Sequence, residues 1–193
     1  MEYRMKLSSL AAALALACAL PATAAESYTI DGVHSQPWFE VNHHGFSLQR
    51  GHFTKLTGGA SLDLASKSGS VKVSIDVASV DMGLPVWSEQ VKEKFFDAAK
   101  FPAMSFESER FVFDGETPVA VEGRFTLRGV TRPLSLKVTN FKCGTNPFNK
   151  KALCGAEITA SFKRSDFGMS YGLAGIGDEV KITVPLEAYR VAP

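Results

Sequence analysis

The sequence predicts an all-β fold of about eight antiparallel strands and one short amphipathic helix. Apolar and polar side chains alternate on both sides of a short break at 128–133, which is typical of a half-buried antiparallel hairpin. Similar alternating segments follow one another along the chain, separated by turn residues. Helical periodicity is convincing only at 81–99 once the N-terminal region is set aside. Many alternating strands in succession predict an antiparallel barrel or a sandwich, and a closed barrel leaves no exposed edge strand.

The hairpin at Val119–Val138 shows the pattern most completely. Its first strand places Gly123 in one phase with the apolar side chains of Val119, Val121, Phe125 and Leu127. Polar side chains fill the other phase, and the alternation resumes after Arg128–Pro133 with Leu134, Leu136 and Val138. One face of each strand therefore meets apolar surroundings and the other meets water. Whether the apolar face contacts a packed core or a ligand is the main question for the whole chain.

Four strands are expected before the helix. They are Tyr28–Ile30, Gln36–His43, Phe53–Leu64 and Val71–Val77. Asp31-Gly32 turns or bulges the chain after the first strand, and Gly45 and Gly51 mark a turn region after the second. Gly58-Gly59 is expected to bend the third strand without ending it.

The segment 81–99 predicts the helix. Pro85 suits the first helical turn, and Trp87, Val91 and Phe95 repeat every four residues. We expect this stripe to face the rest of the protein.

Strand patterns return after Phe101-Pro102. The expected strands are Met104–Phe106, Phe111–Phe113, the two strands of the hairpin, Ala156–Lys163 and Val180–Leu186. A glycine-rich connection, Gly168–Gly177, precedes the last of them.

Residues 1–24 are predicted to be a cleaved signal peptide. Arg4 and Lys6 precede an apolar run of 14 residues, and Ala22-Thr23-Ala24 fits a cleavage site. The run is shorter than the ~20 residues that span a bilayer, which disfavours a membrane anchor. A lipoprotein attached at Cys18 is also disfavoured, because the run continues past that cysteine. Residues 25–193 are then a single exported domain, and we expect a periplasmic location.

The charge balance disfavours two kinds of partner, nucleic acid and an anionic surface. Without residues 1–24 the chain has 19 basic and 19 acidic side chains, so its formal net charge is zero. Such a balance gives no electrostatic reason to bind nucleic acid.

Two cysteines remain after cleavage, Cys143 and Cys154. An even number in an oxidising compartment predicts one disulfide, at the neck of the loop Gly144–Lys151. A redox-active pair is less favoured, because the spacing is not C-x-x-C.

The composition leaves the use of the apolar faces open. The mature chain contains all 14 phenylalanines, which supply bulk without a polar group. Small and large residues share phases, as in Val121-Gly123-Phe125. In a packed core the two sizes interlock, whereas in a lined channel the small positions leave room. The pattern by itself favours the packed core.

Five motifs in series resemble the YceI-like family of bacterial exported proteins. They are Tyr28-Thr29-Ile30-Asp31 with His34-Ser35, Phe95-Phe96-Asp97 with Phe101-Pro102 and Phe106-Glu107-Ser108, Gly123–Pro133, Arg164–Gly168, and Gly177–Val180. The resemblance covers essentially the whole mature chain. It implies a lipocalin-like eight-stranded barrel with an apolar tunnel for a polyisoprenoid, such as a prenyl pyrophosphate or a quinone tail. Glu89 and Gln90 stand where the family often has a histidine, and the loop between the cysteines is an elaboration.

The resemblance favours a binding module over a packed core. The expected lining residues are Phe39, Val41, Phe53, Val73, Ile75, Phe106, Phe125, Leu127, Leu136 and Phe162. For each of them, ordinary core packing is the alternative. Arg128, Arg132 and Arg164 are candidates for an anionic head group, because guanidinium pairs well with phosphate. Their alternative role is as turn and surface charges.

A metal site or an enzyme is the second hypothesis. The four histidines, His34, His43, His44 and His52, lie within 19 residues of sequence. His43 and His44 are adjacent and would face opposite sides of a strand, and no catalytic motif accompanies them. We therefore expect no enzymatic activity, no metal and no required cofactor other than a bound lipid.

The third hypothesis is a structural or stress-related partner protein, in which the packed barrel holds no ligand and serves only as a platform. If the ligand is a quinone, a membrane redox protein is a natural neighbour. The connection Gly168–Gly177 is expected either to gate the tunnel or to form a homodimer contact, and the sequence does not rank the two.

Overall fold

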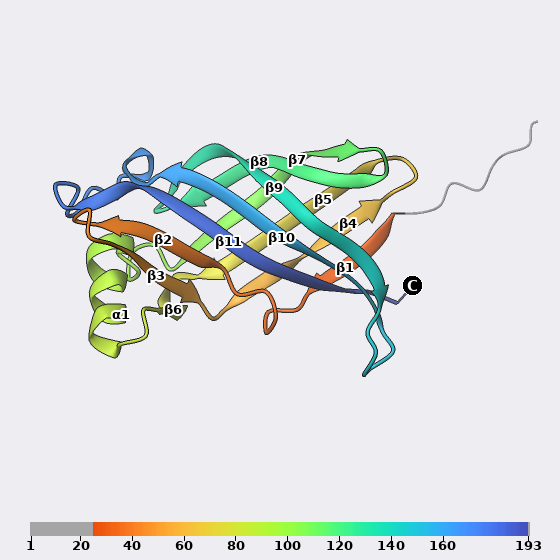
Figure 1. The fold of residues 1–193 in the computed structure, drawn as a ribbon, viewed down its shortest axis with the longest axis horizontal. Helices are drawn as coiled ribbons and strands as arrows, with labels where there is room; N and C mark the ends of the chain where they lie inside the picture. The colour runs from red at the N-terminus through yellow and green to blue at the C-terminus, as the bar shows by residue number, and fades with distance from the viewer. Residues whose placement is uncertain (1–24, 193) are drawn as a thin grey trace, which may run out of the picture.

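The computed structural model describes residues 25–192, and they form a closed antiparallel β-barrel (Figure 1). Eight strands close the ring in the order β1-β4-β5-β7-β8-β9-β10-β11, and β11 pairs back onto β1. Their bounds are β1 Glu26–Ile30, β4 Leu56–Asp63, β5 Ser68–Asp76, β7 Ala103–Asp114, β8 Thr117–Leu127, β9 Val130–Thr145, β10 Ala152–Lys163 and β11 Ile176–Arg190. The barrel prediction is confirmed. The predicted signal peptide lies outside the described residues.

The long strand β11 has a different neighbour at each of its ends. Its C-terminal part pairs with β1, whereas its N-terminal part pairs with β2 (Trp38–His43). β2 continues the sheet to β3 (Ser47–Phe53), which pairs with the two-residue strand β6 (Val80–Asp81). The helix lies beside these strands, at the end of the barrel opposite the C-terminus (Figure 1).

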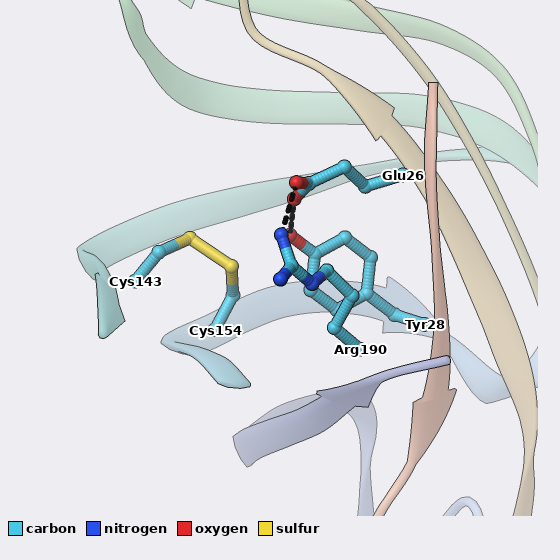
Figure 2. Close-up of a disulfide and its surroundings, with 5 residues drawn as sticks. All are labelled: Glu26, Tyr28, Cys143, Cys154 and Arg190. Carbon is cyan, nitrogen blue, oxygen red and sulfur yellow. Dashed lines mark hydrogen bonds and ion pairs between the residues drawn. A yellow bond between two sulfur atoms is a disulfide. The ribbon is translucent and has the colours of Figure 1, made fainter. Parts of the chain in front are cut away.

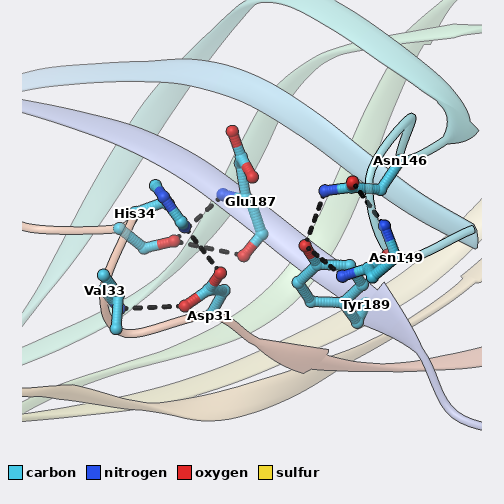
Figure 3. Close-up of polar contacts among 8 residues, drawn as sticks. Asp31, Val33, His34, Asn146, Asn149, Glu187 and Tyr189 are labelled. Carbon is cyan, nitrogen blue, oxygen red and sulfur yellow. Dashed lines mark hydrogen bonds and ion pairs between the residues drawn. The ribbon is translucent and has the colours of Figure 1, made fainter. Parts of the chain in front are cut away.

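Between the parts of β11 that pair with β1 and with β2, Ser35 takes the place of a strand partner. The buried Ser35 hydroxyl donates to the carbonyl of Glu187 and accepts the N–H of the same residue, at 3.1 and 2.9 Å. Asp31 accepts from the N–H of Val33 and from His34, which fixes the turn that follows β1. Figure 3 shows this turn against β11. The N–H of Glu187 would otherwise lack a strand partner and is satisfied by Ser35, whereas the carbonyl of Glu187 also accepts from the N–H of Asp31.

The central hairpin is confirmed, but its turn is shorter than expected. Val121 pairs with Leu136, and the two strands run to Leu127 and from Val130. Only Arg128 and Gly129 form the turn, and both have positive φ, at 51° and 73°. Two such residues make the tight turn that matches the twist of a hairpin.

Other boundaries needed correction. β3 was not expected, and Gly51 lies buried inside it, so Gly51 does not mark a turn. The two short strands predicted at 104–106 and 111–113 are one strand, β7, with a bulge near Ser108. The bend at Gly58-Gly59 is confirmed, because β4 runs through both residues and Gly58 has a φ of 149°.

The predicted helix is present but shorter. α1 spans Pro85–Val91 with Pro85 in the first turn, and one π-helical turn, η2 (Lys92–Phe96), continues it. Asp97 ends the segment in the left-handed conformation. Two short 3₁₀ turns complete the elements, η1 (Val77–Ser79) and η3 (Arg164–Phe167). Across residues 25–192, no helix has the length and apolar character to cross a membrane.

The end of the barrel near the C-terminus is held by covalent and polar contacts (Figure 2). Cys143 and Cys154 face each other across β9 and β10 and form the predicted disulfide. Tyr28 and Arg190 both donate to the carboxylate of Glu26. These bonds lower the pKa of Glu26, while burial and the bond to Glu26 raise the pKa of Tyr28 to about 12. Buried apolar side chains fill this end, among them Leu62, Val121, Val138, Ile158 and Ala188.

Candidate functional site

An apolar cavity occupies the opposite end of the barrel, beside α1. Its volume is about 330 Å³, within the ~300–1,000 Å³ typical of small-molecule sites. β11 contributes one wall through Val180, Ile182 and Val184, which alternate along the strand and so share its inner face. The helical segment contributes another wall, chiefly through aromatic rings.

The helical wall consists of the stripe seen in the sequence. Trp87, Val91 and Phe95 all line the cavity, together with Phe96. Because Trp87, Val91 and Phe95 recur every four positions, one face of α1 and η2 presents these three toward the barrel. Trp87 is still 46% exposed, so it lies where the cavity meets solvent.

Phenylalanine rings make up much of the remaining surface. Phe39 and Phe96 both contact Phe53, with ring centroids 5.8 and 5.4 Å apart. On another part of the wall Phe125 and Phe162 lie 5.3 Å apart, and Phe167 packs behind both. These spacings are those of favourable aromatic pairs, so the walls are supported by their own contacts.

Four polar side chains line the cavity: His43, Gln49, Gln90 and Arg164. Only Arg164 is charged at all ordinary pH values, and it is 1% exposed. The lining contains no Asp, Glu, Lys, Ser, Thr or Cys. The cavity thus favours an apolar occupant that needs few hydrogen bonds.

Arg164 is occupied by the backbone of the neighbouring loop. Its Nε donates to Gly177, its Nη1 to Met169 and Tyr171, and its Nη2 to Ile176, all at carbonyl oxygens 2.7–2.8 Å away. Burial lowers the pKa of Arg164, and the nearby charge of Asp178 opposes that effect. Since four of its five N–H groups are used in this way, the guanidinium shapes the loop 168–177.

A carboxylate supports the same loop from behind. Asp178 accepts from the N–H and the hydroxyl of Ser165, at 2.9 and 2.8 Å. Burial by itself would raise the pKa of Asp178, but the bonds from Ser165 and the charge of Arg164 bring it below the ordinary value. Asp178 is therefore a carboxylate at neutral pH, and its charge offsets that of Arg164.

Only one of the three arginines predicted for a head group reaches the cavity. Arg128 donates to the carbonyl of Phe95 at 2.6 Å and lies over the ring of Phe101. Arg132 is exposed on β9, and neither side chain is part of the lining. Their sequence positions, at a turn and just after it, gave no sign of where the side chains would point.

Seven of the ten predicted lining residues border the cavity: Phe39, Val41, Phe53, Ile75, Phe125, Leu127 and Phe162. The other three, Val73, Phe106 and Leu136, belong to the packed part of the interior. Gly123 explains part of this difference. A Cβ at Gly123 would lie 2.6 Å from the ring of Phe106, so that ring occupies the space that the glycine leaves.

Several lining residues were not predicted. Met82, Met104 and Met169 border the cavity, as do Ile176 and the β11 row. The alternation at Val180–Val184 was visible in the sequence, and it indicates which side chains of this strand point inward. Met82 and Met169 carried no comparable signal, because they lie in connections.

The four histidines do not form one group, although the rings of His43 and His44 lie 4.5 Å apart. His43 and His44 are neighbours at the β2–β3 turn, His52 stacks on Trp38 at 4.4 Å, and His34 lies on the β1–β2 loop. Within residues 25–192, one group has ligand atoms close enough for a metal, namely Asp31, His34 and Glu187. Asp31 and His34 are already bonded to each other, and this bond lowers the pKa of Asp31 and raises that of His34.

The sequence of the chain matches a known family. The profile of the YceI-like domain matches residues 28–188. The chain belongs to the YceI-like domain family. A UPF0312 protein of Shewanella sp. (strain W3-18-1) is 30% identical over 191 residues, which cover 96% of this chain and 100% of the relative.

Solved structures share the barrel. BcnA of Burkholderia cenocepacia superposes with a TM-score of 0.70 at 25% identity, over 82% of this chain and 98% of BcnA. A polyisoprenoid binding domain from Saccharophagus degradans, implicated in plant cell wall breakdown, superposes with a TM-score of 0.64. At 16% identity, over 86% of this chain and 99% of that domain, the second likeness shows the fold alone.

Proposed function

We propose that this protein is a non-catalytic binding protein that holds the isoprenoid tail of a lipid in the cavity, for transport, storage or shielding. The observation that carries the proposal is the cavity itself, whose walls are apolar except for four side chains. Membership of the YceI-like family, and the binding named for the Saccharophagus degradans domain, support it.

An apolar tail binds in such a cavity because its surface is removed from contact with water. Each 100 Å² of apolar surface that the tail buries contributes ~2.5 kcal/mol, from which the costs of association are subtracted. No hydrogen bond to the tail is needed. The seven predicted residues that border the cavity are the residues that we propose contact it.

The head group is proposed to be uncharged. The only cation of the lining, Arg164, already donates to four carbonyl oxygens. His43, Gln49 and Gln90 are the remaining polar groups, and imidazole and amide groups suit the carbonyl or hydroxyl of a quinone or a polyprenol. A diphosphate would lose hydration without gaining a free cation, which is unfavourable. A quinone or polyprenol is therefore preferred to a prenyl diphosphate.

Catalysis is not part of the proposal. Nucleophilic or acid–base chemistry needs a nucleophile and a base in contact, and the lining offers one imidazole without a nucleophile beside it.

The place of action is proposed to be the periplasm, reached by means of residues 1–24. The disulfide Cys143–Cys154 supports an oxidising compartment. If the bound lipid is a quinone, a membrane redox protein is the proposed partner.

Native mass spectrometry of the protein purified from its own cells, followed by solvent extraction, tests the proposal. We expect a bound mass that resolves into isoprene units. Apo protein is then offered a quinone and a prenyl diphosphate of equal tail length. Uptake of the quinone in preference supports the uncharged head group, uptake of the diphosphate in preference contradicts it, and uptake of neither contradicts lipid binding.

A further inference from the structure

We infer that the open end of the barrel docks on a lipid bilayer through an apolar rim around the cavity mouth, so that the cavity faces the membrane surface. The inference rests on the proposed function, because it gives the lipid a route between bilayer and cavity. The rim consists of three segments: 44–49 at the β2–β3 turn and the start of β3, 82–88 around the start of α1, and 168–177 in the loop before β11 and its first two residues.

The three segments surround one opening. Gln49, Trp87 and Ile176 each come from a different segment, and all three line the cavity. The N–H of His44 donates to the carbonyl of Gly175 at 2.6 Å, which joins the first segment to the third. The rings of Tyr171 and Phe95 lie 5.1 Å apart, which joins the third segment to the helical wall. Figure 1 shows α1 and the two turns at the same end of the barrel.

Large apolar side chains of the rim point into solvent. Phe46 is 91% exposed and Val86 is 70% exposed. Five further side chains are 40–50% exposed: Leu48, Leu84, Trp87, Tyr171 and Leu173. Scattered exposed apolar residues are ordinary, but a ring of them around a cavity mouth marks an interaction site.

The rim contains no charged residue. Segments 44–49, 82–88 and 168–177 lack Asp, Glu, Lys and Arg, although 21% of the chain is charged. The turns at the other end differ, with Lys67 at 64–67, Asp114 and Glu116 at 114–117, and Lys150 and Lys151 at 146–151. Charges do flank the rim, and each has a partner: Glu89 pairs with Lys92 and Arg50 with Glu40. Asp81 accepts from the N–H of Gly83, and Asp178 accepts from Ser165.

This chemistry favours a bilayer over a second copy or another protein as the occupant. Charges oppose entry into the acyl region of a membrane, and the rim has none to desolvate. Trp87 and Tyr171 are of the types that gather at the membrane–water interface. A protein partner would offer polar groups at its edge, and the rim side chains supply few to match them. An isoprenoid moving through this mouth would also avoid crossing water.

Flotation with phosphatidylcholine vesicles tests the inference, with the partition coefficient measured against lipid concentration. The variant Phe46→Ser/Val86→Ser/Leu173→Ser removes three exposed apolar side chains. It should partition at least ~100-fold more weakly, because three apolar side chains are no longer transferred from water into the bilayer. Phe148→Ser is the matched control, since Phe148 is 93% exposed on the β9–β10 turn at the other end. It should partition as the wild type does.

The salt dependence of the partition coefficient distinguishes apolar docking from electrostatic docking. The wild-type partition coefficient should change less than ~2-fold between about 0.1 and 1 M salt, because charge contributes little. A steep loss with salt, no flotation of the wild type, or equal loss in the control would overturn the inference. So would a dimer in analytical ultracentrifugation that the triple variant dissociates, because the rim would then belong to a second copy.

Lipid content is measured in the same samples. Wild-type protein that carries an isoprenoid but does not float contradicts docking and leaves the proposed function intact. Wild-type protein that takes up no isoprenoid contradicts the proposed function itself.

Discussion

The two ends of the barrel use the same strand pattern for different purposes. Near the C-terminus, β1 closes the ring, and the interior is packed with side chains such as Tyr28, Val121 and Val138, beside the disulfide. The cavity does not extend to this end. At the other end β2 and β3 extend the sheet, and a helical segment completes the wall. Alternation determines which side chains point inward, whereas the element that closes the ring determines whether space remains between them.

The largest expected contrast is in the cost of truncating an inward side chain. Phe106 is 5% exposed and fills the space beside Gly123. Phe106→Ala should lower the free energy of unfolding by ~3–5 kcal/mol, because it leaves a cavity in a packed region. Ile182→Ala enlarges an existing cavity and should cost about half as much or less. Urea unfolding measures both, and equal costs would mean that the two ends are packed alike.

Removing the disulfide should affect stability but not the ligand. Cys143→Ser/Cys154→Ser opens a loop with a sequence separation of 11 residues, which should cost ~2–3 kcal/mol. The cavity is at the other end, so lipid content after refolding should equal that of the wild type. A variant that folds but has lost its lipid would contradict the separation of the two ends.

Filling the cavity should have the opposite effect, because it should weaken lipid binding more than it lowers stability. Ile182→Trp adds a large side chain to the lining and should weaken quinone retention at least ~10-fold, or about 1.4 kcal/mol. Its matched control is Lys181→Trp, the exposed neighbour on the outer face of β11. Native mass spectrometry of reloaded protein compares the two. Full retention by a folded Ile182→Trp protein would place the tail elsewhere.

The last contrast is a pH dependence at the end of the barrel near the C-terminus. Burial raises the pKa of Tyr28 from 10.0 to about 12, so the folded state retains a proton that the unfolded state loses. Stability from this group is full below pH 10 and declines as the pH rises toward about 12. The decline over this window should be smaller in Tyr28→Phe. Urea titrations at several pH values measure it, and identical declines would remove Tyr28 as the source.

Local patterns in the sequence predicted most of the fold, because alternation and turn chemistry are properties of neighbouring residues. The hairpin at 119–138 and the stripe Trp87/Val91/Phe95 were both identified in this way. Gly51 was misread, because a glycine that admits the Phe39 ring and the Met82 sulfur inside a strand looks like a turn glycine in sequence.

The site was less predictable for a physical reason. Phe106 and Phe125 pair across β7 and β8, yet only Phe125 reaches the cavity. Their difference depends on packing between segments distant in sequence. The role of Arg164 was hidden in the same way, because its partners are backbone carbonyls, which no residue type reveals.

Photo-crosslinking tests the central claim, that one end of the barrel holds the lipid tail. The probe is an isoprenoid quinone with a diazirine at the end of its tail, and peptide mass spectrometry maps the adducts. The account predicts adducts on the inner wall of the cavity, at residues such as Met104, Phe125 and Phe162, and none at Val121 or Val138. Adducts at Val121 or Val138, or on the outer surface alone, would contradict it.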